Sequence, residues 1–323
     1  MRDETDMDPA LDSPESADSE WSQAPYLVFS GFSMGTADVV PGVSGGTMAV
    51  VLGIYERLLA AIASVGPKSA TALLKGRLGD ALAPIHWRFI TALLVGIALG
   101  IGLMVKVVRL PHLIEAQPKF VYAIFFGLVL ASAVMLARHI PRWSAGKVIS
   151  LVVGASFGLA VVNLVPVETP ESSWFLFLSG MVAICAMVLP GISGSFVLLI
   201  LGKYAFVLNA LGELDMTVMV PFALGCAVGL TTFSRVVSWA LARWHDTVMA
   251  GLVGLLIGSL WRIWPYQELT TTIVRHKPRV VASEPFWPGG LEIDVVLLGL
   301  TGVVLVFVLE WVAQRREGTS TGG

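Results

Sequence analysis

The stretch Asp38-Val39-Val40-Pro41-Gly42-Val43-Ser44-Gly45-Gly46-Thr47 interrupts an apolar run, and a similar stretch occurs 149 residues later, counted from Pro41 to Pro190. The second copy reads Val188-Leu189-Pro190-Gly191-Ile192-Ser193-Gly194-Ser195. The register continues to Leu52-Gly53-Ile54-Tyr55 against Leu201-Gly202-Lys203-Tyr204. In hydrocarbon, a Pro-Gly pair frees backbone groups, so the break is tolerated only where protein or a water-filled cavity satisfies them. The break therefore predicts a site, and its repetition predicts two related half-sites.

After each Pro-Gly pair the chain can restart a helix, whose first amides are unpaired donors at the positive end of the helix dipole. Helix starts of this kind bind anions, and glycines let a phosphate approach the backbone. The candidate phosphate-binding residues are Ser44, Gly45, Gly46 and Thr47 in the first copy and Ser193, Gly194 and Ser195 in the second, and the motif-forming residues are Pro41, Gly42, Pro190 and Gly191. The alternative reading of both motifs is a close helix-packing turn.

The composition is that of a polytopic membrane protein. Of the 323 residues, 55% are hydrophobic and 14% are charged, with a mean hydropathy of +0.79, whereas a soluble domain has about 25% charged residues. Residues 1–24 are acidic and read as a disordered tail rather than a signal peptide. Apolar segments lie at residues 25–63, 88–110, 120–140, 147–165, 174–211, 217–242, 247–264 and 292–312.

These eight segments form two sets of four, which predicts a duplicated unit with a first repeat at 25–165 and a second at 166–312. The first arm of each Pro-Gly segment is short for a span of roughly 20 residues, so we expect re-entrant hairpins. Each repeat then crosses the membrane three times, and an odd number inverts the second repeat. The predicted fold is an all-α polytopic membrane protein of two inverted repeats, each a re-entrant helical hairpin broken at Pro-Gly plus three transmembrane helices.

Lysine and arginine accumulate in the loops that this topology places in the cytoplasm. The N-terminus and the tail at 313–323 are therefore expected in the cytoplasm, and the protein in the cytoplasmic (inner) membrane. The alternative, in which the Pro-Gly segments cross completely, puts a basic loop or the arginine-containing tail outside. The loop at 265–291 is expected outside although it is basic; a lipid-headgroup contact and a solvated loop are equally good readings.

Asp38 is the leading candidate for coupling transport to an ion or proton, because an ionised carboxylate at that depth is costly; the alternative is local pairing with backbone donors. Arg235 lies well inside an apolar run and is expected to be a counter-charge for the phosphate. The secondary candidates, each with a solvated or snorkelling alternative, are Glu56, Arg57, Arg138, Arg262 and Lys106.

No HExxH, Walker A, GxSxG or paired metal-ligand spacing is present. We therefore expect no enzyme activity, no cofactor, no metal and no nucleic-acid partner. Membrane lipids are expected to surround the protein, and a homo-oligomer is compatible with the sequence.

The two motifs resemble the two signatures of the polyprenyl-phosphate (undecaprenyl phosphate) translocase family, once catalogued as a domain of unknown function. The first signature is matched by Asp38 to Thr47 with Leu52 to Arg57, and the second by Leu189 to Ser195 with Leu201 to Tyr204. The resemblance implies return of undecaprenyl phosphate to the cytoplasmic leaflet for lipid-carrier recycling. The sequence departs from the family at Ser195, where a second glycine is expected, and this predicts a less open second half-site.

Two other function classes stay open. A channel or transporter for small inorganic or organic anions would use the same helix starts. The undecaprenyl-pyrophosphate phosphatases carry a similar Pro-Gly-x-Ser-Arg-Ser-Gly loop, but Gly45 and Gly194 stand where their arginine is. Because of this departure, phosphate hydrolysis ranks third among the three candidate functions.

Overall fold

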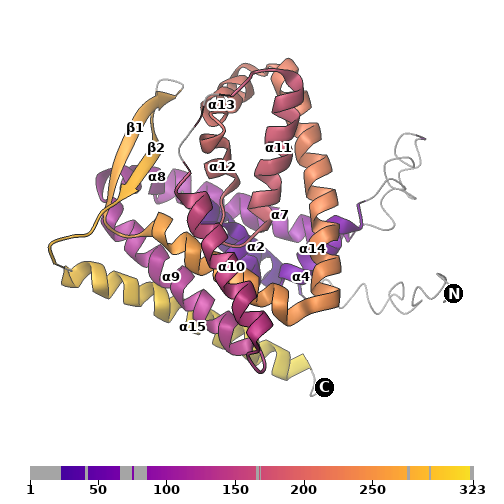
Figure 1. Cartoon of the computed structure of the whole chain (residues 1–323), viewed down its shortest axis with the longest axis vertical. Helices are drawn as coiled ribbons and strands as arrows, with labels where there is room; N and C mark the ends of the chain where they lie inside the picture. Colours follow the sequence, from indigo (N-terminus) through magenta and orange to yellow (C-terminus); the bar gives the residue numbers. More distant parts are fainter. Residues whose placement is uncertain are drawn as a thin grey trace.

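The computed structural model describes residues 23–40, 43–65, 75, 86–164, 167, 169–274, 277–290 and 292–320. These residues are mostly helical, and the helices pack side by side with one strand pair projecting from them (Figure 1). Four of the described helices are long and apolar enough to cross a membrane, or up to six if each bent helix pair counts as one span. The protein is therefore a multi-pass membrane protein, as the composition predicts.

The helices of the two halves follow the same order. The first half contains α2 (Ala24–Asp38), α3 (Gly45–Val51), α4 (Tyr55–Ala63), α7 (Trp87–Gly102) with the π-helix η2 (Leu103–Val107), α8 (Leu110–Ala116), α9 (Pro118–His139) and α10 (Ala145–Val162). The second half contains α11 (Ser173–Val188), α12 (Gly194–Ile200), α13 (Tyr204–Glu213), α14 (Met216–Ser259) with the 3₁₀-helix η3 (Leu260–Ile263), β1 (Gln267–Val274), β2 (Lys277–Pro285) and α15 (Ile293–Ser320).

Each half contains a sharply bent helix pair after its Pro-Gly motif. Helices α3 and α4 meet at 118°, and α12 and α13 meet at 108°. Both bends use a glycine with positive φ, Gly53 at +67° and Gly202 at +63°, a conformation that glycine adopts without the steric cost of a side chain. The repeated Leu-Gly-x-Tyr sequence therefore forms the same turn twice.

Helix α14 is 44 residues long, about twice the length that a single span needs. Its backbone is non-helical at Trp244, with φ −138° and ψ 48°. This break separates the two apolar segments that the sequence predicts at 217–242 and 247–264.

Glycine contacts bring α2 and α7 close together, and they bring α11 and α14 together in the same way. A Cβ added to Gly31 would lie 2.1 Å from the Leu93 carbonyl oxygen, and one added to Gly35 would lie 2.3 Å from that of Ile97. Residue numbers therefore rise together along α2 and α7, which means that the two helices run parallel. Small residues permit this close approach of backbones in membrane helices.

Two further close pairs connect the halves, α10 with α14 and α9 with α15. The Leu151 carbonyl faces Gly254, and the Ala155 carbonyl faces Gly258. Helix α10 and the second part of α14 therefore also run parallel. Most of the apolar surface of α10 outside this contact is exposed.

The segment 265–291, expected as a long basic loop, contains an antiparallel hairpin of β1 and β2. Its register runs from Gln267 opposite Pro285 to Val274 opposite Lys277. The hairpin adds two strands to the helical fold where only a loop is expected, and β2 contacts η3.

Candidate functional site

The two Pro-Gly turns are neighbours in the folded chain. Gly191 donates its backbone N–H to the Thr47 hydroxyl oxygen at 3.1 Å. On its other side, a Cβ added to Gly191 would lie 2.7 Å from the Ser259 hydroxyl oxygen of α14. The second turn therefore lies between the first motif and α14. Pro41 and Gly42, the turn residues of the first motif, lie outside the described residues.

The backbone donors of the first motif are occupied by oxygens of the protein. Asp38 Oδ1 accepts from the Gly45 N–H at 2.7 Å, and Ser44 Oγ accepts from the Gly46 N–H at 3.2 Å. The Thr47 N–H donates to the Ser44 carbonyl at 2.9 Å. Ser44 to Thr47 are all buried. In this conformation the Asp38 carboxylate takes the place at the start of α3 that we expected an anion to occupy.

The second motif is the more accessible of the two. The hydroxyl oxygens of Ser193 and Ser195 lie 2.7 Å apart, and Ser195 is exposed. No side chain caps α12 at Ser193. A Cβ added to Gly194 would lie 2.7 Å from the Ala183 carbonyl oxygen, so glycine is needed there for packing against α11. Ser195, the residue at which the sequence departs from the family, is exposed, and its hydroxyl pairs with that of Ser193.

Arg262, a secondary candidate in the sequence, is the basic side chain that lies against the helix of the second motif. It is buried, with 8% of its surface exposed, and its guanidinium carbon lies 4.5 Å from the centre of the Phe196 ring in α12. Phe196 directly follows Ser195. The guanidinium therefore packs against the aromatic ring of α12 that follows Ser195, and it brings a buried positive charge to this helix.

Arg235, the expected counter-charge, contacts a different part of the molecule. Its guanidinium donates to the carbonyls of Ala63 at 3.2 Å and Val65 at 2.7 Å. Both carbonyls lie at the C-terminal end of α4, where unpaired carbonyls and the helix dipole favour a cation. Arg235 therefore joins α14 to the first hairpin.

The other basic candidates are spread over the surface of the helices. Arg57 lies 4.7 Å from the Phe89 ring centre, and Arg138 lies 5.9 Å from that of Phe307. Lys106 is exposed on the π-helix η2. The structure does not bring these three residues together with the second motif in any contact it describes.

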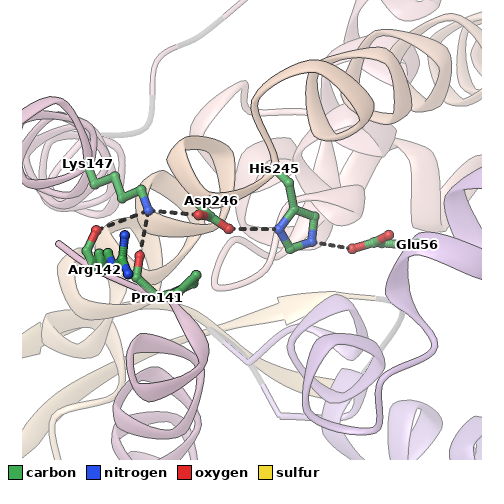
Figure 2. Close-up of polar contacts among 6 residues, drawn as sticks. All are labelled: Glu56, Pro141, Arg142, Lys147, His245 and Asp246. Carbon is green, nitrogen blue, oxygen red and sulfur yellow. Dashed lines mark hydrogen bonds and ion pairs between the residues drawn. The ribbon is translucent and has the colours of Figure 1, made fainter. Parts of the chain in front are cut away.

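Glu56, also a secondary candidate, belongs to a chain of polar contacts at the break in α14 (Figure 2). His245 Nε2 lies 2.8 Å from Glu56 Oε1, and His245 Nδ1 lies 3.3 Å from Asp246 Oδ1. Lys147 Nζ donates to Asp246 Oδ2 at 2.7 Å and to two carbonyls of the α9–α10 turn. We call these four residues the α14 polar chain. It links α4, α14 and α10 outside the apolar spans.

Hydrogen bonding within the α14 polar chain changes the protonation of its members. Partial burial lowers the pKa of His245, but the hydrogen bonds with Asp246 and Glu56 outweigh it and raise the pKa above its usual value. The hydrogen bond from Lys147 lowers the pKa of the Asp246 carboxyl. These hydrogen bonds favour the charged form of the His245 imidazole more than water does.

Sequence reasoning missed this polar chain and also Lys203. Lys203 is buried, and its ammonium group donates to the Thr169 carbonyl at 2.7 Å. The available signal was that a lysine stands in the second repeat where Ile54 stands in the first. Among the residues that the structure describes, no group of three or more His, Cys, Asp or Glu side chains is placed to hold a metal ion.

Comparison with known proteins gives two kinds of match. The model of a family described as undecaprenyl phosphate translocase-like matches residues 34–281. A "Polyprenyl-phosphate transporter" of Vibrio cholerae is 38% identical over 238 residues, which are 74% of this chain and 77% of the relative. A protein of the same name from Staphylococcus aureus is 27% identical over 76% of this chain and 88% of the relative. No solved structure matches the chain.

Proposed function

Because the chain belongs to the undecaprenyl phosphate translocase-like family, we propose that it moves a polyprenyl phosphate, such as undecaprenyl phosphate, across the cytoplasmic membrane for lipid-carrier recycling. The relatives are named transporters of a polyprenyl phosphate, and the protein acts as a transporter rather than an enzyme. The observation that carries the proposal is the hydrogen bond between Gly191 and Thr47, because it holds both broken hairpins at one place.

The phosphate binds first at the accessible second motif. Ser193 and Ser195 supply hydroxyl donors, the amide of Gly194 adds a backbone donor, and Arg262 supplies the positive charge in place of Arg235. A phosphate monoester carries about −1.5 to −2 charges at neutral pH, by analogy with phosphorylated side chains. Charge-assisted hydrogen bonds in a low-dielectric site are the strong ones, and they replace the water that the headgroup loses.

The first motif, Ser44 to Thr47, takes part when Asp38 withdraws. A protonated carboxyl is a weak acceptor, so proton binding to Asp38 releases the Gly45 amide for the phosphate. A proton and the headgroup would then enter together. This exchange gives the coupling that we assign to Asp38.

Helix directions support a re-entrant, inverted arrangement. Helix α2 runs parallel to α7, as two helices that enter the membrane from the same side do; a complete crossing before α7 would make them antiparallel. Helix α10 runs parallel to the second part of α14. Helices α9 and α10 are consecutive spans joined by a short turn, so they run antiparallel. The second part of α14 therefore runs antiparallel to α9, which is its equivalent in the first repeat. The repeats 25–165 and 166–312 are inverted on this argument.

Inverted repeats around a common site allow alternating access by rocking of one repeat against the other. The basic loops support a cytoplasmic position for both termini, including the tail 313–323. The headgroup passes between the two Pro-Gly turns while the isoprenoid chain remains in apolar surroundings.

Proteoliposomes with a leaflet-resolved assay of a fluorescent polyprenyl phosphate test the function. Protein-dependent movement of the lipid between leaflets is the expected result, and a catalytically inert helical membrane protein serves as control. Release of inorganic phosphate from a polyprenyl pyrophosphate would instead identify a phosphatase. An anion current without lipid movement would identify a channel, and either result would overturn the proposal.

A further inference from the structure

Helix α4, the second arm of the first hairpin, is attached to α14 at both of its ends. At its start, Glu56 Oε1 lies 2.8 Å from His245 Nε2 (Figure 2). At its end, the carbonyls of Ala63 and Val65 accept hydrogen bonds from Arg235. Residue numbers rise along α4 while they fall along α14, so the two helices run antiparallel over this contact. We call this contact the α4–α14 clamp.

The α4–α14 clamp joins two elements whose counterparts in the other half are α13 and α7. A Cβ added to Gly96 of α7 would clash with the Val28 carbonyl oxygen of α2. One added to Gly225 of α14 would clash with the Phe177 carbonyl oxygen of α11. Phe177 follows Val28 by 149 residues, the interval that also separates the two Pro-Gly motifs. The pairs α2–α7 and α11–α14 therefore pack through equivalent residues, so contacts of one half have counterparts in the other.

The counterpart of the clamp is open. No comparable contact joins α13 to α7 in the part of the chain that the structure describes. Lys106 of α7 is the counterpart of Arg235, and each precedes a Val-Val pair. Lys106 is exposed on the π-helix η2, whereas α14 is α-helical at Arg235. Leu214, which follows the end of α13 and is the counterpart of Val65, is also exposed.

The two hairpins differ in burial in the same sense. Every residue of α3 is buried, whereas α12 buries only Gly194 and Ile200 of its seven residues. The Ser44 hydroxyl, at the start of α3, donates to the Met187 carbonyl of α11 at 3.4 Å. The first hairpin is thus closed against the second half, while the second hairpin is open. In a transporter with inverted repeats, such unequal contacts change places when one repeat rocks against the other.

We propose that the α4–α14 clamp is one of two alternating gates, and that Lys106 closes the other by binding the carbonyls at the end of α13. The proposal rests on the proposed function and names the contacts that change during transport. When Arg235 releases α4, the first motif becomes accessible, and when Lys106 then holds the end of α13, the second motif is covered. Unpaired carbonyls and the helix dipole favour a cation at either helix end, so both gates use the same chemistry.

Two cysteine pairs test the gates, in a chain whose two native cysteines are replaced by alanine. E56C/H245C lies across the clamp, and K106C/L214C lies across the second gate. Each variant in proteoliposomes is treated with a short bifunctional methanethiosulfonate reagent, which reduction removes. Crosslinking of either pair should abolish polyprenyl phosphate transport, and reduction should restore it. The single variants K106C and L214C, which cannot form the crosslink, are the controls.

A matched pair of arginine variants tests whether the two gates exclude one another. R235Q removes the charge that holds α4, and R243Q removes a charge from an exposed position of the same helix. Losing hydrogen bonds to a charged group changes an equilibrium constant about tenfold or more. K106C/L214C should therefore crosslink about tenfold faster when combined with R235Q, and at an unchanged rate when combined with R243Q.

Three results would overturn the gates. One is transport that continues while E56C/H245C is crosslinked, because the clamp would then be a permanent brace. Another is a failure of K106C/L214C to crosslink in proteoliposomes that transport the lipid, since both positions are exposed. The third is an equal crosslinking rate in R235Q and R243Q. Absence of transport by the unchanged chain, with K106C/L214C still crosslinking faster in R235Q, would instead overturn the proposed function and leave the gates in place.

Discussion

At the scale of single residues, the proposed mechanism depends on Asp38, which occupies a backbone donor at the start of α3. Its carboxylate accepts the hydrogen bond from the Gly45 amide, and a Cβ on residue 45 would lie 2.6 Å from its Oδ2. Glycine at this position therefore makes room for the carboxylate as well as for a ligand. The carboxylate caps the first amide of α3, and such caps are worth about 1 kcal/mol.

We predict that D38N folds normally but loses proton coupling. The asparagine amide oxygen still accepts from Gly45, so the cap is kept, but the side chain no longer exchanges a proton. Transport of polyprenyl phosphate driven by a pH gradient in proteoliposomes should fall at least about tenfold. D38A, which loses the cap, is the control for structural damage. Undiminished, still pH-dependent transport by D38N would remove Asp38 from the coupling mechanism.

Arg262 and Arg235 have different proposed roles: Arg262 supplies charge to the phosphate site, and Arg235 stabilises the contact between α14 and α4. Losing a charged hydrogen-bond partner costs about 1.5–3 kcal/mol, so R262Q should raise the apparent Kd for polyprenyl phosphate roughly tenfold to a hundredfold. R235Q loses its contacts with α4, and it should lower thermal stability with little change in Kd. Equilibrium binding in detergent and thermal unfolding of both variants measure this difference. A larger loss of affinity in R235Q would restore the assignment made from sequence.

At the scale of elements, the α14 polar chain connects three helices through His245 and Asp246. The pKa of His245 is raised in the folded protein, while the unfolded chain keeps a value near 6.5. Folding therefore favours the charged form, and this stabilisation is complete below pH 6.5 and is lost as pH rises through the raised pKa. Because His245 and Glu56 are both more than half exposed, the contribution is small, about 0.5 kcal/mol.

We predict that the thermal stability of the unchanged protein in detergent decreases between pH 6.5 and the raised pKa of His245, relative to H245Q. The two proteins should approach each other in stability above that pKa, where neither carries a charge at residue 245. Thermal unfolding from pH 6 to pH 9 measures the difference. A stability advantage of the unchanged protein that grows with pH would contradict the assigned protonation.

Sequence patterns predict those elements whose formation depends on local spacing. The repeated Pro-Gly and Leu-Gly-x-Tyr segments are enough to predict two broken hairpins, because the turn needs only proline and glycine backbones. The contact of Arg235 with α4 joins residues 172 and 170 positions apart, and that of Lys147 with Asp246 joins residues 99 positions apart. The position of Arg235 within an apolar run predicts that it lies in the membrane, but it does not identify its partner. The hydrogen bond between Gly45 and Asp38 depends on the backbone conformation of the turn between them, which the sequence pattern does not predict.

At the scale of the whole molecule, helices of the first half pack against helices of the second: α9 packs on α15, and α10 packs on α14. Each of these pairs joins the second span of one repeat to the third span of the other. Glycines recur at both contacts: Gly127 faces Gly299, and Gly154 faces Gly251. The proposed two-fold relation between the repeats would produce both pairs by the same packing. The proposed rocking of the repeats would then have to preserve or exchange these contacts while it separates the two Pro-Gly turns.

The proposed inverted arrangement makes a prediction about the chain near the starts of α10 and α15. Gly146 lies in the first turn of α10 and Gly289 lies shortly before α15, and a Cβ on either meets no atom within 4 Å. With both native cysteines replaced by alanine, G289C should react with a membrane-impermeant maleimide in intact cells. G146C should react only after the cells are permeabilised, because an inverted second repeat puts corresponding segments on opposite sides of the membrane. Labelling of both cysteines from the same side would mean that the repeats are parallel, and two Pro-Gly hairpins entering from one side would leave no symmetric path for a headgroup between the leaflets.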